Sequence, residues 1–133
     1  MNQRGQTLVM FVLMLAVLLL GLLALVGDVG AVAFEYERAN SSALLGAQAG
    51  AADIDLVSLY TSNARQLDPN AATVCRTTAM QSPGSSATCT PSGTTITATV
   101  SRQARLPIPV WGVSVPVRAV RTAQAVFGDA TPK

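Results

Sequence analysis

Histidine is missing from the 133 residues of the sequence, cysteine occurs only twice, and aromatic residues make up 5%. Without histidine the usual pairs of a nucleophile with a base are excluded, and no glycine-rich phosphate loop is present. Asp53 and Asp55 are two residues apart, so on a helix their carboxylates point in different directions. The two cysteines form no CxxC pair, which excludes a zinc site. We therefore expect no enzyme, no catalytic residue, no metal site and no cofactor.

Charged residues are also scarce, with 9 basic and 7 acidic side chains and a formal net charge of +2. A charge this small predicts no nucleic-acid partner. No charged residue lies between Leu8 and Gly27, a segment built mainly of Leu, Val, Met, Ala, Phe and Gly. A helix of about 20 apolar residues spans a hydrocarbon layer of about 30 Å. Residues 8–27 are therefore expected to span a membrane or to form the core of a filament.

The charges that flank this apolar segment differ in sign. Arg4 comes before it, and the first charges after it are Asp28, Glu35 and Glu37. A basic N-terminal flank favours a cytoplasmic N-terminus, so the C-terminal part is expected outside the cytoplasm. The expected location is the inner or cytoplasmic membrane, before any assembly at the cell surface.

Cys75 and Cys89 both belong to the part that is expected to be exported. In an oxidising compartment a disulfide between them is the simplest expectation, and two unpaired buried thiols are the alternative. A disulfide that closes a loop of about 15 residues contributes about 3 kcal/mol in the chain-entropy description. Such a staple suits a domain that is too small to rely on its core alone.

Three fates compete for the apolar segment. As a secretory signal peptide it would be removed after the sequence Ala31-Val32-Ala33, but the run is longer than such signals and Asp28 precedes the site. As a prepilin segment it would lose a short basic leader, residues 1–5, by a cut between Gly5 and Gln6, and the helix would stay. As an anchor it would stay intact.

Several short motifs follow one another along the first 52 residues. An Arg-Gly pair opens the apolar run, an Asp-x-Gly follows near its end, and a further arginine precedes a helix of small residues. Here they are Arg4-Gly5, Asp28-Val29-Gly30, Arg38 and residues 43–52. In order and spacing they resemble the N-terminal region of the TadE/TadG-like proteins of bacterial Tad (Flp) pilus systems. The resemblance implies a pilin-like subunit that binds copies of itself and the pilus assembly machinery, and that passes from the membrane into an extracellular filament.

Met10 departs from the pattern of the cleaved pilins of this class, which usually carry glutamate at the fifth position after the cleaved glycine. That carboxylate would pair with the N-terminal amine of a neighbour inside a low-dielectric bundle. Since methionine carries no charge, an uncleaved N-terminus is favoured, as in the TadG-like branch. Two alternatives to a filament subunit stay open: a membrane-anchored accessory protein of pilus assembly, and a membrane-anchored adhesin or sensor module.

No proline occurs before Pro69, so a long helix over residues 6–66 is expected. Small side chains let helices approach closely. Those beyond the membrane segment are expected either to pack against other subunits in a filament core or to pack against the chain's own C-terminal domain. Asp28 is expected to be solvated at the outer membrane interface or to pair with Arg4 or Arg38 of a neighbour. The candidate residues for helix assembly are Met10, Gly21, Gly27, Asp28, Gly46, Ala47, Gly50 and Ala51.

Residues 67–133 are expected to form a small extracytoplasmic β domain, which makes the fold α+β. Residues 69–95 are rich in Ser, Thr, Ala, Gly and Pro and are expected to form a stapled surface loop. Alternating apolar residues in 94–100 and 113–127 predict a hairpin that closes near Trp111 and pairs Ile96 with Phe127.

In this register Arg102 would lie opposite Arg121, and Arg105 opposite Arg118. Like charges directly opposed are unfavourable. An anionic partner between them, or a carboxylate from Asp53, Asp55 or Asp68, would relieve the repulsion. The alternative is a different register in which the four arginines are solvated.

Overall fold

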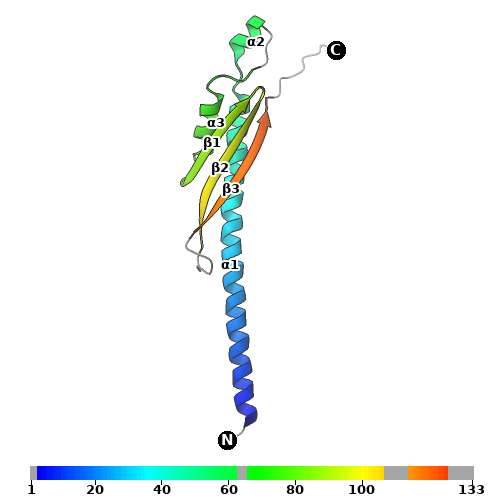
Figure 1. The fold of residues 1–133 in the computed structure, drawn as a ribbon, viewed down its shortest axis with the longest axis vertical. Coiled ribbons are helices and arrows are strands. Elements are labelled where there is room, and N and C mark those ends of the chain that lie inside the picture. The colour runs from blue at the N-terminus through cyan, green and yellow to red at the C-terminus, as the bar shows by residue number, and fades with distance from the viewer. Residues whose placement is uncertain (1–2, 63–65, 107–113, 126–133) are drawn as a thin grey trace, which may run out of the picture.

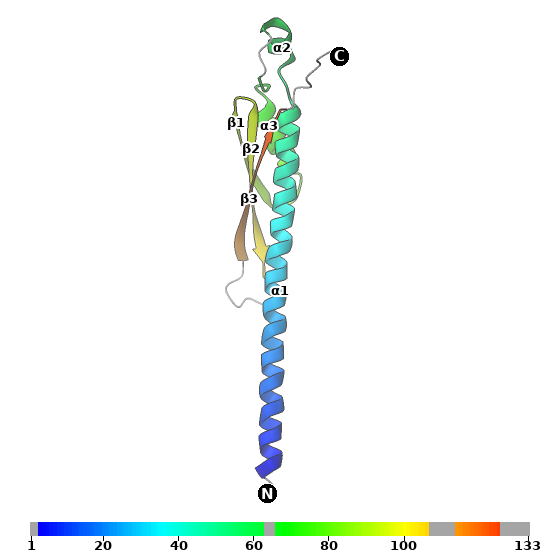
Figure 2. The ribbon, with the colours of Figure 1, turned by 90° about the vertical axis from the view of Figure 1, so that its right-hand side faces the viewer.

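The computed structural model describes residues 3–62, 66–106 and 114–125. Its elements are α1 (Gln3–Ala52), α2 (Leu56–Ser62), α3 (Ala71–Ala79), β1 (Ser85–Ser92), β2 (Thr95–Arg105) and β3 (Ser114–Gln124). Figure 1 shows that α1 runs along most of the molecule, that α3 and the three strands lie beside its C-terminal half, and that α2 lies beyond its C-terminal end. The N-terminal half of α1 projects away from the domain, and Figure 2 shows the same from the side. The expected α+β fold, a long apolar helix followed by an antiparallel sheet, is confirmed.

The first helix ends at Ala52, so the expectation of one helix to residue 66 is wrong. After Ala52 the chain is extended, and Ile54 forms an isolated antiparallel bridge with Leu67. The backbone N–H of Asp55 donates to the carbonyl of Gln66 at 3.2 Å. The Asp55 carboxylate then accepts the backbone N–H groups at the start of α2 and caps it. The chain thus leaves α1 through an extended segment, and the Asp55 cap begins α2 without a proline.

Residues 69–95, expected as a loop, contain α3 and β1 instead. The sheet therefore has three antiparallel strands in the order β1-β2-β3, not two. Ile96 pairs with Ala123 rather than with Phe127, which lies outside the described residues together with Trp111. The inner and outer faces of β2 and β3 are as expected, because this shift keeps the alternation in phase. The predicted register is wrong although the predicted faces are right.

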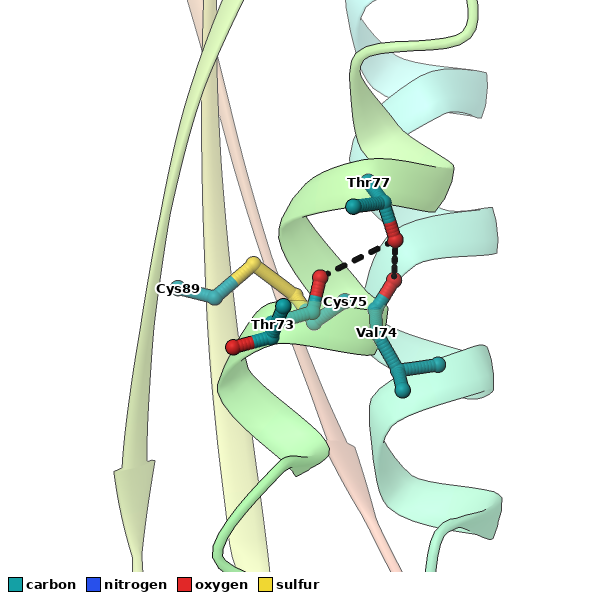
Figure 3. Close-up of a disulfide and its surroundings, with 5 residues drawn as sticks. All are labelled: Thr73, Val74, Cys75, Thr77 and Cys89. Atoms are coloured by element: carbon teal, nitrogen blue, oxygen red, sulfur yellow. Dashed lines mark hydrogen bonds between the residues drawn. A yellow bond between two sulfur atoms is a disulfide. The ribbon is translucent and has the colours of Figure 1, made fainter.

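The core lies between the C-terminal half of α1, the helix α3 and the inner face of the sheet. It is built mostly of small side chains, and the largest fully buried ones are Ile96, Val100 and Cys75. Cys75 on α3 forms the expected disulfide with Cys89 on β1, with the two Cα atoms 6.2 Å apart. Figure 3 shows this bond joining helix and strand beside α1. It also shows Thr77 donating to the carbonyls of Thr73 and Val74 one turn earlier. The disulfide covalently holds the edge strand onto the core.

Candidate functional site: the apolar stalk and the base of the domain

The N-terminal half of α1 presents large apolar side chains to its surroundings. Every side chain from Gln6 to Leu23 is exposed, including Phe11 at 69% and Met14 at 79%. We call residues 6–27 the stalk. In the described part of the chain, α1 is the one helix long and apolar enough to cross a membrane, a test that signal sequences also pass. The stalk therefore needs a cover that the domain does not supply.

The small residues beyond the stalk are used inside the chain itself. Those predicted to join helices of different subunits, but buried here, are Gly46, Ala47, Gly50 and Ala51. A Cβ added at Gly46 would lie 2.7 Å from the Cβ of Ala79, and one at Gly50 would lie 2.8 Å from the Cβ of Cys75. The absence of side chains lets α3 lie directly against α1. These four residues therefore pack within the chain, which is the alternative that the sequence left open, and not between subunits as predicted.

The other predicted assembly residues divide into two groups. Met10, Gly21 and Gly27 lie on the exposed stalk, and no atom outside the helix lies within 4 Å of the place where a Gly21 Cβ would be. Asp28, the residue directly after the stalk, is instead buried, with only 4% of its surface exposed. The expectation of a solvated Asp28 at the membrane interface is therefore wrong.

Asp28 is buried because the sheet reaches down to it. It lines a cavity of about 470 Å³ between α1 and the ends of β2 and β3. Its other walls are mainly apolar and include Leu25 and Val32 of α1, Leu106 directly after β2, and Val115 of β3. We call the end of the domain around Leu106 and Val115 the base. It lies beside α1 at the level where the stalk ends.

A buried ion pair joins α1 to β2 just above this level. Arg102 is 9% exposed on the inner face of β2, and its Nε donates to Oε2 of Glu35 at 2.8 Å. The other oxygen of Glu35 lies 3.5 Å from Nη1 of Arg38, whose guanidinium stacks over the ring of Phe34. The carboxylate that forms an ion pair with Arg102 therefore belongs to Glu35, and not to Asp53, Asp55 or Asp68. The i, i+3 spacing of Glu35 and Arg38 on a helix predicts only the pair within α1, and nothing in the sequence points from Glu35 to Arg102.

The four arginines predicted to face an anionic partner are not brought together. Arg102 pairs across the sheet with Val117, and Arg105 pairs with Ser114. Arg118 is exposed on the outer face opposite Ser101. Arg121 lies on the edge strand and donates to Oδ1 of Asn40 at 2.6 Å. Three of the four are thus exposed in a different register, as the alternative expected, and only Arg102 and Arg105 share a cavity.

The predicted processing site, Gly5 and Gln6, lies in the first turns of α1. Among the described residues no group of three or more His, Cys, Asp or Glu side chains could hold a metal ion. The features with functional potential in the described part of the chain are the exposed stalk and the arginines at the base. Comparison with protein-family models, with curated proteins and with solved structures found no match to this chain.

Proposed function

We propose that the chain is a structural, pilin-like subunit of an extracellular Tad/Flp-type pilus that assembles through its stalk. The observation that carries the proposal is the division of α1 into two parts. Its C-terminal part is packed under the sheet, and its N-terminal part is apolar and exposed over residues 6–23. Both parts belong to one unbroken helix of 50 residues. The TadE/TadG-like motifs on the same helix support the assignment.

A physical argument links this division to assembly. Apolar surface in water costs about 25 cal/mol per Å², so an exposed stalk is not stable in an aqueous environment. A lipid bilayer can cover it before assembly, and the stalks of neighbouring copies can cover it afterwards. The folded domain and the disulfide lie at the other end of the helix, where they need no lipid. One helix thus serves as a membrane anchor first and as a filament core later.

A second candidate function is a membrane-anchored accessory protein in pilus assembly. Met10 favours it, because this exposed stalk position carries no carboxylate to pair with the free amine of a cleaved neighbour. In this alternative the stalk stays in the bilayer. A membrane-anchored adhesin or sensor module is the candidate from another class, and it shares the anchor but not the filament.

The experiment is the analysis of filaments sheared from cells that produce the chain, together with the membranes left behind. A filament subunit is expected as the bulk protein of the sheared fraction. Trace amounts there, with the bulk in the membrane, would contradict the subunit role and support the accessory role. Complete absence from filaments would support the adhesin or sensor. Intact-mass measurement on the same sample decides whether the protein begins at Gln6 or keeps residues 1–5.

A further inference from the structure

A second cavity lies at the base, on the side of α1 that faces the start of β1. It has a volume of about 470 Å³, and we call it the base cavity. Its walls include Phe34 and Glu35 of α1, Gly84 from the turn before β1, and Arg102, Gln103 and Arg105 of β2. A smaller adjoining cavity is lined by Arg102 together with Arg38. Arg102 thus lies between two hollows at the same end of the domain.

The base cavity has an excess of positive charge. Three arginines, Arg38, Arg102 and Arg105, line the two cavities together with one acidic residue, Glu35, so the formal charge of these lining residues is +2. The Nε of Arg102 donates a hydrogen bond to Glu35. Its buried Nη1 has no hydrogen-bond partner among the described residues. A guanidinium carries five N–H donors and matches the oxygens of a phosphate well.

The depth of the base cavity follows from the rise of the helix. At about 1.5 Å per residue, Ala31 in its wall lies about 6 Å beyond Gly27, and Glu35 lies about 12 Å beyond it. The polar layer of a bilayer adds about 5 to 8 Å on each side of the hydrocarbon core. If residues 8–27 span that core, the lower edge of the base cavity at Ala31 lies among the lipid headgroups, and Glu35 lies about 4 to 7 Å above them. The exposed ring of Phe34 in the cavity wall suits an amphipathic molecule better than a free ion.

We propose that the base cavity binds the phosphate of an anionic phospholipid from the membrane in which the stalk is anchored. Arg105 and Arg38 approach the phosphate from the two hollows, and Arg102 lies between them. The excess of two positive charges favours a lipid with net negative charge over a zwitterionic one. This inference rests on the proposed membrane anchorage but not on filament assembly. It assigns the anionic partner expected from the sequence to Arg102 and Arg105, together with Arg38, and leaves out Arg118 and Arg121.

The test uses the full chain in nanodiscs that contain phosphatidylcholine and a minor fraction of phosphatidylglycerol. The protein is released in mild detergent, and native mass spectrometry measures which lipids stay bound. The variant is Arg38→Gln/Arg105→Gln, which leaves the buried Arg102–Glu35 pair intact. The matched control is Arg76→Gln/Arg118→Gln, which removes the same charge from exposed positions away from the base cavity. Enrichment of phosphatidylglycerol is expected in the natural chain and in the control, with a loss of about fivefold per arginine in the variant.

Several outcomes would overturn the inference. One is the absence of enrichment in the natural chain, and another is an equal loss in the variant and the control, which would indicate general charge attraction. Displacement of the lipid by millimolar inorganic phosphate would show a site for a small anion instead. A chain that fails to enter nanodiscs would contradict the anchorage itself, a failure that is distinguishable from a missing lipid preference.

Discussion

Glu35 holds two arginines at once, one on its own helix and one on β2. The Arg102 side chain is 8% exposed and that of Glu35 20%, so little solvent screens their charges. Removing one partner of a buried pair leaves the other charge uncompensated, which is far more costly than losing a surface pair. The carboxylate of Glu35 therefore has a structural role, because it joins α1 to β2 through Arg102.

A first prediction concerns Glu35→Gln. The amide can still accept from Arg102 but carries no charge, so we expect the free energy of unfolding to fall by about 2 kcal/mol. The measurement is chemical denaturation in detergent micelles, followed by circular dichroism. Glu37→Gln is the control, because Glu37 is exposed, and its effect should stay within about 0.5 kcal/mol. Equal effects of the two substitutions would contradict a special role for Glu35.

A second prediction concerns Gly46, where α3 crosses α1. The Cβ of an alanine would lie 2.7 Å from the Cβ of Ala79 and 2.9 Å from the carbonyl oxygen of Cys75, and neither atom can rotate away. Such overpacking costs about 1 to 3 kcal/mol, which exceeds the gain of about 1 kcal/mol in helix propensity. We expect Gly46→Ala to lower the melting temperature of the domain.

Gly21→Ala is the matched control, since its Cβ would meet nothing within 4 Å. The same change of residue should there leave the melting temperature unchanged or raise it slightly. If Gly46→Ala behaved like Gly21→Ala, the close approach of α1 and α3 would not exist in solution.

At the scale of elements, periodic patterns in the sequence predict the long helix and the faces of the strands, but they do not predict where a helix ends or how two strands are paired. The long charge-free run and the late first proline predict α1, but they give no sign of its end at Ala52 or of the bridge between Ile54 and Leu67 that follows. Alternation predicts the faces of β2 and β3, yet pairing Ile96 with Ala123 or with Phe127 places the same faces inward. Periodicity alone therefore cannot give the register.

The polar segment 69–95 was mistaken for a loop because its apolar residues are few and small. The buried side of α3 consists of Ala71, Cys75 and Ala79, and β1 buries only Ala87 fully. Alanines at helical spacing are a weak signal compared with leucines, and serine and threonine elsewhere in the segment suggest a linker. The Arg102–Glu35 pair was missed for another reason, since it joins residues 67 positions apart in the chain.

A third prediction belongs to the short helix α2. Hydrogen bonds to the Asp55 carboxylate, from the Ser58 side chain first and then from the backbone N–H groups of Ser58 and Val57, lower its pKa. Because the folded pKa lies below the unfolded one, the cap stabilises α2 fully above about pH 4 and is lost as pH falls through the lowered pKa. Carboxyl chemical shifts measured by NMR against pH should show the lowered pKa.

Ser58→Ala removes the hydroxyl that contributes most to this shift. We expect the pKa of Asp55 to return part of the way to its ordinary value, with the backbone donors still in place. An unchanged Asp55 pKa in the variant would show that the hydroxyl does not hold the carboxylate.

At the scale of the whole molecule, the stalk and the sheet face different surroundings. Their separation along α1 means that an assembly driven by the stalk leaves the outer face of the sheet at the surface (Figure 2). That face is polar: ten of its residues are serine or threonine, it has no carboxylate, and its cations are Arg118 and, at the end of β2 beside the base cavity, Arg105. The ten are Ser86, Thr88, Thr90, Ser92, Thr95, Thr97, Thr99, Ser101, Ser114 and Thr122. The proposed filament would thus expose hydroxyl groups and bury leucines.

The final prediction tests this arrangement with cysteines placed at its two ends. Both natural cysteines are used in the disulfide, so an added cysteine is the one free thiol of the chain. Leu13→Cys puts it on the stalk, and Val120→Cys puts it on the outer face of β3; both positions are more than half exposed. In sheared filaments a short bis-maleimide should join Leu13→Cys subunits into dimers, because neighbouring stalks lie about 8 to 10 Å apart when helices pack. Val120→Cys subunits should stay monomeric on denaturing gels, and detergent-dispersed subunits of both variants should not react in pairs. Dimers formed through Val120 but not through Leu13 would contradict this arrangement, because they would mean that the subunits associate through their sheets and not through their stalks.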